Sequence, residues 1–355
     1  MRILRSCFGS RSVPYAGVRV KAKSGFAASE RPAPFREAPG SGTLTSPMAK
    51  EAPKTVLVAV GADLLVAVAK GIAAVLTGSA AMAAECLHSL IDAANQGLLV
   101  VGQRRSSRPA DDSHPFGYGA EIYFWALVVA VVIFGAGGGL TIVEGVYRFV
   151  KPEPPGNPLW NYAVLAIAFV ADGSALVVAI RALRKSYPNR PLHRAIHASK
   201  DPNVFVVVLE DSAALVGVLI AFAGTFAAQL MHDGRPDAIA SMGIGVVLLS
   251  VALIMMREVG SLLTGESIDP EIVAAIETVA QEQLPVAEVR RVLTMTLGPQ
   301  SVVVAMDLVF HQDISVDDAA TAIDRIRSEV QKRQPIVTEI FVQIDALAGK
   351  GRRAA

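Results

Sequence analysis

The sequence lacks several features that would point to particular chemistries. It has only two cysteines, Cys7 and Cys86, which excludes a disulfide framework and a CxxC metal site. It contains neither HExxH, the zinc motif of metalloproteases, nor GxxxxGK followed by Ser or Thr, the phosphate-binding loop of nucleotide hydrolases. We therefore expect neither an enzyme nor a nucleotide-driven pump.

Charged residues are also scarce. They make up 18% of the chain, whereas hydrophobic residues make up 52%. Soluble domains are about 25% charged, so this balance favours an integral membrane protein. The formal net charge of +1 is spread unevenly along the chain, and we expect no nucleic-acid partner.

Six apolar segments follow one another in the first three quarters of the chain. Each is close to the roughly 20 residues that a helix needs to cross a lipid bilayer. They cover residues 54–77, 79–102, 120–147, 159–182, 202–228 and 236–259. Six such segments in a row predict a membrane all-α bundle of six transmembrane helices rather than buried helices of a soluble protein.

Basic residues gather in two of the connecting loops, after the second and the fourth segment. They are Arg104, Arg105, Arg108, Arg184, Lys185, Arg190, Arg194 and Lys200. The positive-inside rule places these loops and both termini in the cytosol or its topological equivalent. The expected location is the plasma (inner) membrane of a bacterium or an organellar membrane of a eukaryote.

The two ends of the chain differ from this apolar part. Residues 1–50 are basic and have no sustained apolar period, which predicts a disordered tail. An organellar targeting segment, a cytosolic tail and a chain that really starts at Met48 all stay open. The membrane domain then covers residues 51–264.

Residues 265–350 have the composition of a soluble domain. Two stretches have a helical period and three read as strands, in the order αββαβ. The stretches are 270–284, 289–297, 301–310, 316–333 and 339–345. This order favours a C-terminal α+β ferredoxin-like cytosolic domain.

A polar stripe on the second segment carries the strongest functional signal. Glu85, His88, Asp92 and Asn95 are spaced by three, four and three residues, which places them on one face of a helix. A His nitrogen and an Asp oxygen one turn apart can ligate one cation, and zinc accepts such ligands. A hydrogen-bonded His–Asp pair that holds helices together is the alternative. The length of the stripe favours the metal site.

The fifth segment contains a second acidic pair, Glu210 and Asp211. Adjacent helical residues point about 100° apart, so we expect one to ligate the ion and the other to face helix contacts or a proton path. Buried carboxylates without a cation take up protons, which suits metal–proton exchange. Alternatively, one of them pairs with Lys70 of the first segment, which can also pair with Asp63.

The loop between the second and third segments contains Asp111 and His114, three residues apart. Together they can bind a cation in transit, although turns commonly contain Asp for backbone reasons.

The stretch from Leu76 to Asp92, LTGSAAMAAECLHSLID, resembles the first-to-second helix passage of the cation diffusion facilitators. The loop PADDSHPFGYG and the order of spans and C-terminal domain resemble the same family, most closely its branch with mitochondrial zinc transporters. The resemblance implies a proton-coupled exporter of Zn²⁺ that binds the ion and protons. It also implies a homodimer formed through the C-terminal domain and the membrane helices.

The resemblance further implies two metal ligands from the second helix and two from the fifth. His88, Asp92 and Asp211 match three of them, and the fourth falls on Val207, which cannot bind metal. Glu210, Ser212 or water are the candidates to replace it. Asp111 and His114 match a secondary cytosolic site of the family.

Three alternatives remain. The ion can be Mn²⁺, Fe²⁺ or Co²⁺, because carboxylate-rich sites accept harder ions. The incomplete ligand set also fits a non-transporting, metal-binding membrane scaffold. A membrane-embedded metalloenzyme is disfavoured because the sequence shows no general-base motif.

Overall fold

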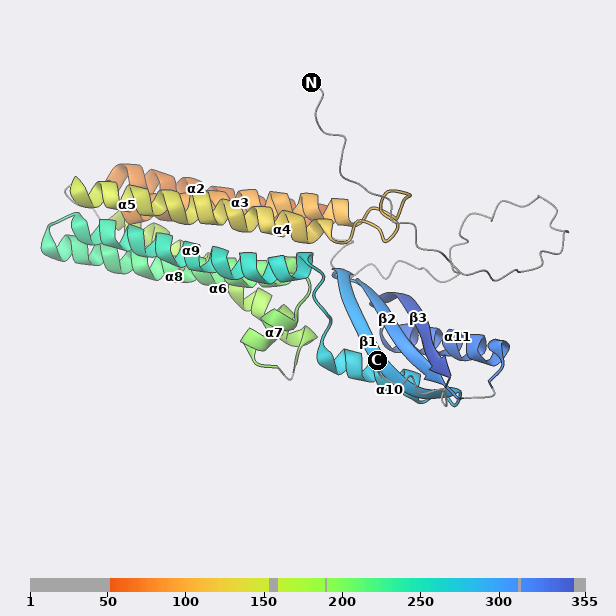
Figure 1. Ribbon diagram of the computed structural model, residues 1–355. Helices are drawn as coiled ribbons and strands as arrows, with labels where there is room; N and C mark the ends of the chain where they lie inside the picture. The colour runs from red at the N-terminus through yellow and green to blue at the C-terminus, as the bar shows by residue number, and fades with distance from the viewer. Residues whose placement is uncertain (1–51, 153–158, 189, 312–313, 348–355) are drawn as a thin grey trace, which may run out of the picture. The chain divides into compact units, whose positions relative to one another are not determined.

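The computed structural model describes residues 52–152, 159–188, 190–311 and 314–347. The basic tail predicted for residues 1–50 lies outside the described residues. Figure 1 shows a group of long helices and a small sheet with two helices of its own.

Helices occur at all six positions where the sequence predicts transmembrane segments. They are α2 (Ala52–Thr77), α3 (Ala80–Ser106), the run of α4 (Glu121–Val132), η1 (Ile133–Gly139) and α5 (Leu140–Val150), then α6 (Leu159–Ser186), α8 (Pro202–Met231) and α9 (Arg235–Leu263). A short helix, α7 (Leu192–Ala198), lies in the basic stretch before α8.

Four helical stretches in the described part of the chain are long and apolar enough to cross a membrane. They are Glu121–Val150, Leu159–Lys185, Pro202–Met231 and Arg235–Leu263. The apolar part of α2 is shorter, Leu64–Thr77, and the charged residues of α3 lower its hydropathy. The structure therefore supports a multi-pass bundle, and the count of six spans stays a prediction.

The local sequence explains where the two helices with candidate ligands begin. Ser79 Oγ accepts a hydrogen bond at 3.1 Å from the backbone N–H of Met82 and caps α3. Gly78, with φ of 67°, allows α2 to end and α3 to begin within two residues. The Asp201 carboxylate caps α8 in the same way, and Pro202 fits the first helical position because its missing N–H has no partner there anyway.

The segment η1 interrupts the third predicted span with π-helical turns, which the sequence analysis did not foresee. Its sequence, IFGAGGG, contains four glycines, and glycine-rich stretches hold an α-helix weakly. The helical axis nevertheless continues from α4 into α5.

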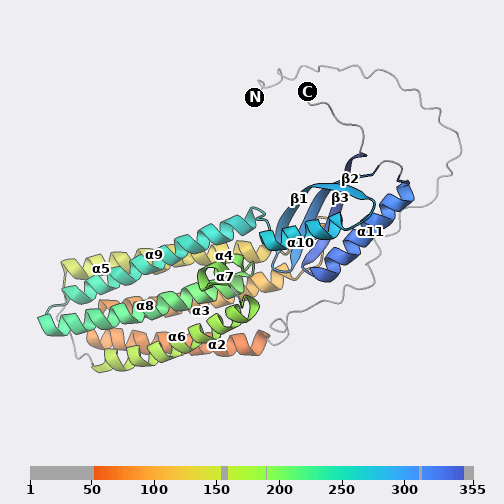
Figure 2. The same ribbon diagram turned by 90° about the horizontal axis from the view of Figure 1, so that it is seen from below.

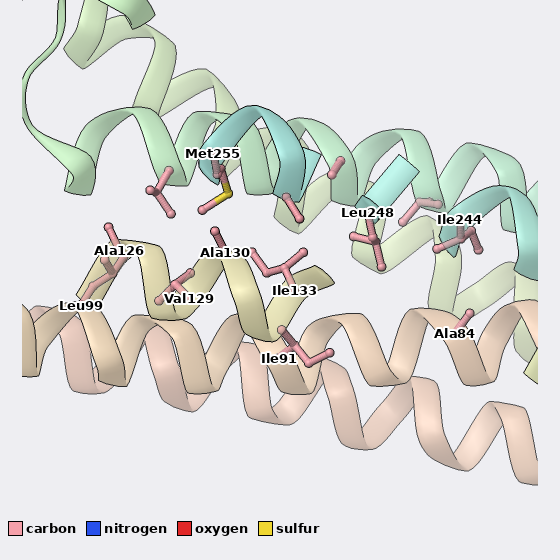
Figure 3. Close-up of a cluster of buried hydrophobic side chains, with 14 of the residues drawn as sticks. Ala84, Ile91, Leu99, Ala126, Val129, Ala130, Ile133, Ile244, Leu248 and Met255 are labelled. Atoms are coloured by element: carbon pink, nitrogen blue, oxygen red, sulfur yellow. The ribbon is translucent and has the colours of Figure 1, made fainter. Parts of the chain in front are cut away.

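The core of the bundle lies between α3, α4 with η1, and α9. Figure 3 shows its side chains meeting between these helices. They include Ala84, Ile91 and Leu99 of α3, Val129 and Ile133 of the third span, and Ile244, Leu248 and Met255 of α9. This apolar face of α3 packs against α4 and α9 and leaves the polar stripe to face α2 and α8.

The C-terminal part has the predicted order of elements. It consists of α10 (Pro270–Gln281), β1 (Val286–Gly298), β2 (Ser301–Phe310), α11 (Val316–Arg333) and β3 (Val337–Leu347). The sheet order is β1-β2-β3, with β1 antiparallel and β3 parallel to β2. One core joins both helices to the strands, so they cover one face of the sheet (Figure 2). The order αββαβ is confirmed, and the ferredoxin-like assignment stays a prediction.

Candidate metal centre

The helices α3 and α8 pack side by side and run in opposite directions (Figure 2). Three contacts between them show the opposite directions, because residue numbers fall along α3 as they rise along α8. The contacts join Gln103 with Asn203, Asn95 with Glu210, and Glu85 with Gly217. The polar stripe of α3, from Glu85 to Asn95, therefore lies along the interface with α8.

His88, which is buried, and Asp92, which is partly buried, form a pair on α3. The distance from His88 Nε2 to Asp92 Oδ2 is 3.3 Å, and the two side chains are 4% and 21% exposed. They lie between Asn95 and Glu85 along the helix. An imidazole nitrogen and a carboxylate oxygen at this separation can both contact one cation, as the spacing in the sequence predicted.

Glu210 and Asp211 lie on α8 and differ in their surroundings. Glu210 is buried, and its Oε1 accepts a hydrogen bond at 2.8 Å from Asn95 Nδ2. Asp211 is partly buried on the adjacent face. The expectation that one of the two carboxylates makes contacts between helices is met by Glu210.

Within the described residues, no three His, Cys, Asp or Glu side chains lie close enough together to hold a metal ion. The structure thus brings His88 and Asp92 together and leaves Asp211 on the neighbouring helix. Ligand distances near 2 Å are needed for zinc, so a three-ligand site requires α3 and α8 or their side chains to move closer.

Lys70 of α2 pairs with a carboxylate of α3, a partner that the sequence analysis did not name, and its pairing with a carboxylate of α8 stays a prediction. Its Nζ donates to Glu85 Oε2 at 2.8 Å and to Ser89 Oγ at 3.0 Å. The side chains of Lys70 and Glu85 are both 0% exposed. The tight turn at Gly78 explains the pairing, because Lys70 precedes it and Glu85 follows it by nearly equal numbers of residues.

That equal spacing was the available signal for the pair. The side chain of Asp63, the other predicted partner of Lys70, lies outside the described residues.

A small pocket with several polar lining residues lies at the N-terminal end of α3. Asp237 of α9 lines it and accepts a hydrogen bond at 2.8 Å from Ser79 Oγ and one at 3.1 Å from the N–H of Ala81. Thr77, Asn161 and other polar residues complete its walls. The sequence analysis did not single out Asp237, because nothing in the spacing along α9 links it to α3.

Asp111 and His114 lie in the loop after α3, both about half exposed, with 3.7 Å between Asp111 Oδ1 and His114 Nδ1. Asp111 Oδ1 accepts from Ser113, and its Oδ2 accepts from Tyr118 at 2.7 Å. The hydrogen bonds from Ser113 and then Tyr118 hold the pKa of Asp111 well below its usual range. The carboxylate thus organises the turn, and a cation site here stays a prediction.

Comparison with known families gives two matches that together span most of the chain. Residues 56–264 match the family model of the cation efflux transmembrane domain. Residues 268–347 match the family model of the cytoplasmic domain of cation efflux proteins.

The chain is also similar to individual proteins, one named for zinc and another for manganese. A mitochondrial proton-coupled zinc antiporter of Mus musculus is 30% identical over 82% of this chain and 58% of its own length. A metal tolerance protein of Arabidopsis thaliana is 35% identical over 53% of this chain and 42% of its own. A manganese efflux system protein of Bacillus subtilis is 24% identical over 82% of this chain and 95% of its own. The chain therefore spans less than two thirds of the length of the mouse and plant proteins.

Proposed function

Because this chain belongs to the cation efflux family, whose members are transporters and not enzymes, we propose that it carries zinc across a membrane in exchange for protons. The direction of transport is out of the cytosol, and the ion binds between α3 and α8 during a cycle of alternating access.

The pair of His88 and Asp92 inside the bundle is the observation that carries this proposal. Ionisable side chains are rare inside membrane helices and mark ion pathways or proton relays. Here an imidazole and a carboxylate lie 3.3 Å apart on the face of α3 that meets α8. Asp211 on α8 supplies the third ligand, and two carboxylates balance the charge of a divalent cation.

Exchange with protons follows from the chemistry of these ligands. An imidazole and two carboxylates bind a metal ion only when they are deprotonated, so protons and metal compete for the same atoms. Three protein ligands also hold an ion less firmly than a closed four-ligand structural site. Val207, where the family resemblance places a fourth ligand, lies one turn before Asp211 and has no donor atom.

The two nearby candidates for the fourth ligand differ in their present bonds. Ser212 Oγ donates to the backbone carbonyl of Val208 at 2.6 Å, and Glu210 Oε1 accepts from Asn95. A hydroxyl that already bonds its own helix can still accept a metal on its lone pair. Glu210 already links α8 to α3 through Oε1 and has its second oxygen, Oε2, as the atom that could bind metal, so Glu210, Ser212 and water all stay candidates for the fourth position.

The proposed architecture has six spans, with both termini and the loops that follow α3 and α6 on the cytosolic side. The division into a membrane domain at 51–264 and a cytosolic domain at 265–350 is supported by the two family matches, which meet between residues 264 and 268. The ferredoxin-like assignment rests on the order αββαβ, and homodimerisation rests on the match to the family's cytoplasmic domain.

Manganese is the second candidate ion. A relative from Bacillus subtilis is named for manganese efflux, and Asp92 and Asp211 are oxygen ligands that manganese accepts. His88 favours zinc over manganese, because imidazole suits zinc and manganese prefers carboxylate, carbonyl and water oxygens.

Zinc flux into proteoliposomes under an imposed pH gradient tests the function. We expect flux in the wild type and a loss of about a hundredfold in His88→Ala and Asp211→Ala, because even the outer-shell partners of metal ligands contribute about 10- to 100-fold to affinity. Matched controls are His311→Ala and Asp324→Ala, which replace the same residue types at exposed positions of the C-terminal domain.

Both controls should transport at the wild-type rate. A wild type that binds zinc but moves neither zinc nor manganese would reject the transporter and favour the scaffold. Flux that persists without the pH gradient and is unchanged by it would reject proton coupling alone.

A further inference from the structure

The ion pair between Lys70 and Glu85 is not used by the proposed ligand set. Both side chains are fully buried, and their charged atoms are 2.8 Å apart. Burying two such charges has a desolvation cost of several kcal/mol per ion, and apolar residues of the same size often stabilise a fold equally well (about 1–4 kcal/mol better in some cases). A role in stability alone is therefore a weak explanation for the pair.

Only one oxygen of the Glu85 carboxylate is engaged. Oε2 accepts from Lys70, whereas Oε1 is buried and has no hydrogen-bond partner among the described residues. Oε1 points at Gly217 of α8 and occupies the space that a side chain at that position would fill. A buried carboxylate oxygen without a hydrogen-bond partner among the described residues thus lies in the α3–α8 interface, on the same face of α3 as His88 and Asp92.

The order of residues along the interface gives Glu85 a definite place. The interface begins at Gln103 and Asn203, near the basic loops, and ends at Ser79, where Asp237 lines the polar pocket. Glu85 lies three residues closer to the pocket than His88, which is about 4.5 Å along a helix. An ion that leaves His88 in that direction meets Glu85 before it reaches the pocket.

A cation that binds Glu85 would be repelled by the Lys70 ammonium unless that ammonium moves away. Asp172 of α6 offers that charge another partner, since it interacts electrostatically with Lys70 and its Oδ2 is buried without a hydrogen bond in the described structure. The long lysine side chain joins its ammonium to α2 through a flexible stem, so a small rotation can move it between the two carboxylates.

We propose that Glu85 is a second station for the transported cation, on the pocket side of His88, and that the Lys70 ammonium occupies this station whenever the cation is absent. The inference rests on the proposed function. Gly217 keeps the station open because any side chain there would meet Glu85 Oε1. Lys70 acts as a tethered substitute for the ion and moves toward Asp172 when the ion arrives.

The double variant Lys70→Met/Glu85→Met separates this role from a structural one. It removes both charges at once and replaces them by apolar side chains of similar length, so no single buried charge is left behind. We expect the apparent KM for zinc to stay within about threefold and the maximal flux to fall about tenfold, the pattern of a group needed after the first binding step.

Wild-type flux from the double variant would overturn the inference and leave the ion pair a helix–helix contact. The absence of flux in the wild type itself would instead overturn the proposed function. The single variant Glu85→Gln provides a second test, because its amide oxygen can still accept from Lys70 while the negative charge is lost.

For Glu85→Gln we expect the same fall in maximal flux. Zinc binding, measured by equilibrium dialysis, should be unchanged. Normal flux in this variant would reject the station. Glu277→Gln is the matched control. It makes the same change in an exposed acid of α10, in the C-terminal part of the chain, and should transport normally.

Discussion

Two interfaces of the bundle are built in opposite ways. Between α3 and α8 the buried residues include Glu85, His88, Asn95 and Glu210. Where η1 and α5 meet α9, the contact is made by glycines and apolar side chains. The residues are Gly138, Ile142, Gly145, Met242, Gly245 and Leu249.

The second interface brings backbones close together. A Cβ at Gly245 would lie 3.0 Å from the carbonyl oxygen of Gly138, and one at Gly145 would lie 2.9 Å from the backbone nitrogen of Met242. In a membrane, where lipid competes with apolar side chains, such close packing of small residues is a main source of helix association. The interface therefore has one tight arrangement and resists movement.

The α3–α8 interface differs because it also contains hydrogen bonds between polar side chains, which join Asn95 with Glu210 and Gln103 with Asn203. Such bonds between membrane helices contribute only about 0.6 kcal/mol each on average. Two helices joined in this way can shift relative to each other at small cost, which alternating access requires. Under the proposed function, the α3–α8 interface is where we expect helices to shift, and the close contact of η1 and α5 with α9 is expected to stay unchanged.

The largest effect is expected from breaking the tight interface. In Gly245→Leu the new Cβ would lie 2.6 Å from Ile142 Cγ1 and 3.1 Å from the backbone nitrogen of Ile142. The backbone nitrogen cannot rotate away as a side chain can. Overpacking of this kind costs about 1–3 kcal/mol or more. We expect a much lower thermal unfolding midpoint and little monodisperse protein by size-exclusion chromatography.

The control for this change lies on the same helix. A Cβ at Gly260 meets nothing within 4 Å, so Gly260→Ala should keep or slightly raise the midpoint, because alanine is favoured over glycine in a helix by about 1 kcal/mol. If both variants unfolded alike, the glycines of α9 would matter through helix propensity and not through close packing.

A smaller effect, on transport and not on folding, is expected at the polar interface. Asn95→Ala removes the donor that bonds Glu210 Oε1 at 2.8 Å. This bond positions α8 beside the His88–Asp92 pair, so we expect zinc flux to fall about tenfold, as for other groups that orient metal ligands. The unfolding midpoint should change much less than in Gly245→Leu.

Gln103→Ala is the matched control for Asn95→Ala. Gln103 accepts a hydrogen bond from Asn203 across the same two helices, near the start of α8 and away from the candidate ligands. Near-normal flux is expected. An equal loss in both variants would mean that α3–α8 hydrogen bonds act on stability in general and that Asn95 has no specific link to the site.

The sequence predicted those features that depend on spacing within one element. The positions of the helices, the face shared by His88 and Asp92, and the order αββαβ all follow from local periodicity. The family resemblance identified mainly from the stretch between Leu76 and Asp92 is confirmed by the family matches. Each of these can be read without knowing how the elements pack.

What could not be predicted depends on packing between elements. Lys70 was assigned to other partners because its true partner, Glu85, lies on the next helix, across the turn at Gly78. The hydrogen bond between Asn95 and Glu210 and the placement of Asp237 at the start of α3 also join residues far apart in the chain. Helical periodicity gives the face of each residue but not the helix that this face meets.

The smallest effect on zinc flux is expected in the loop after α3, which lies beyond the two interfaces compared above. Hydrogen bonds from Ser113 and Tyr118 lower the pKa of Asp111, so its contribution to the turn is complete above about pH 4 and is lost only as the pH falls further. Asp111 therefore stays ionised in a transport assay between about pH 5 and pH 8, and any pH dependence there comes from other groups.

If Asp111 only organises the turn, Asp111→Asn should change zinc flux little, since an amide oxygen can still accept from the N–H groups of Ser113 and His114. His114→Ala should then leave the apparent KM unchanged. If the loop instead binds zinc in transit, both variants should raise the apparent KM by similar factors, with normal flux at saturating zinc. Measuring flux against zinc concentration for the two variants decides whether the polar ion path extends beyond the α3–α8 interface into this loop.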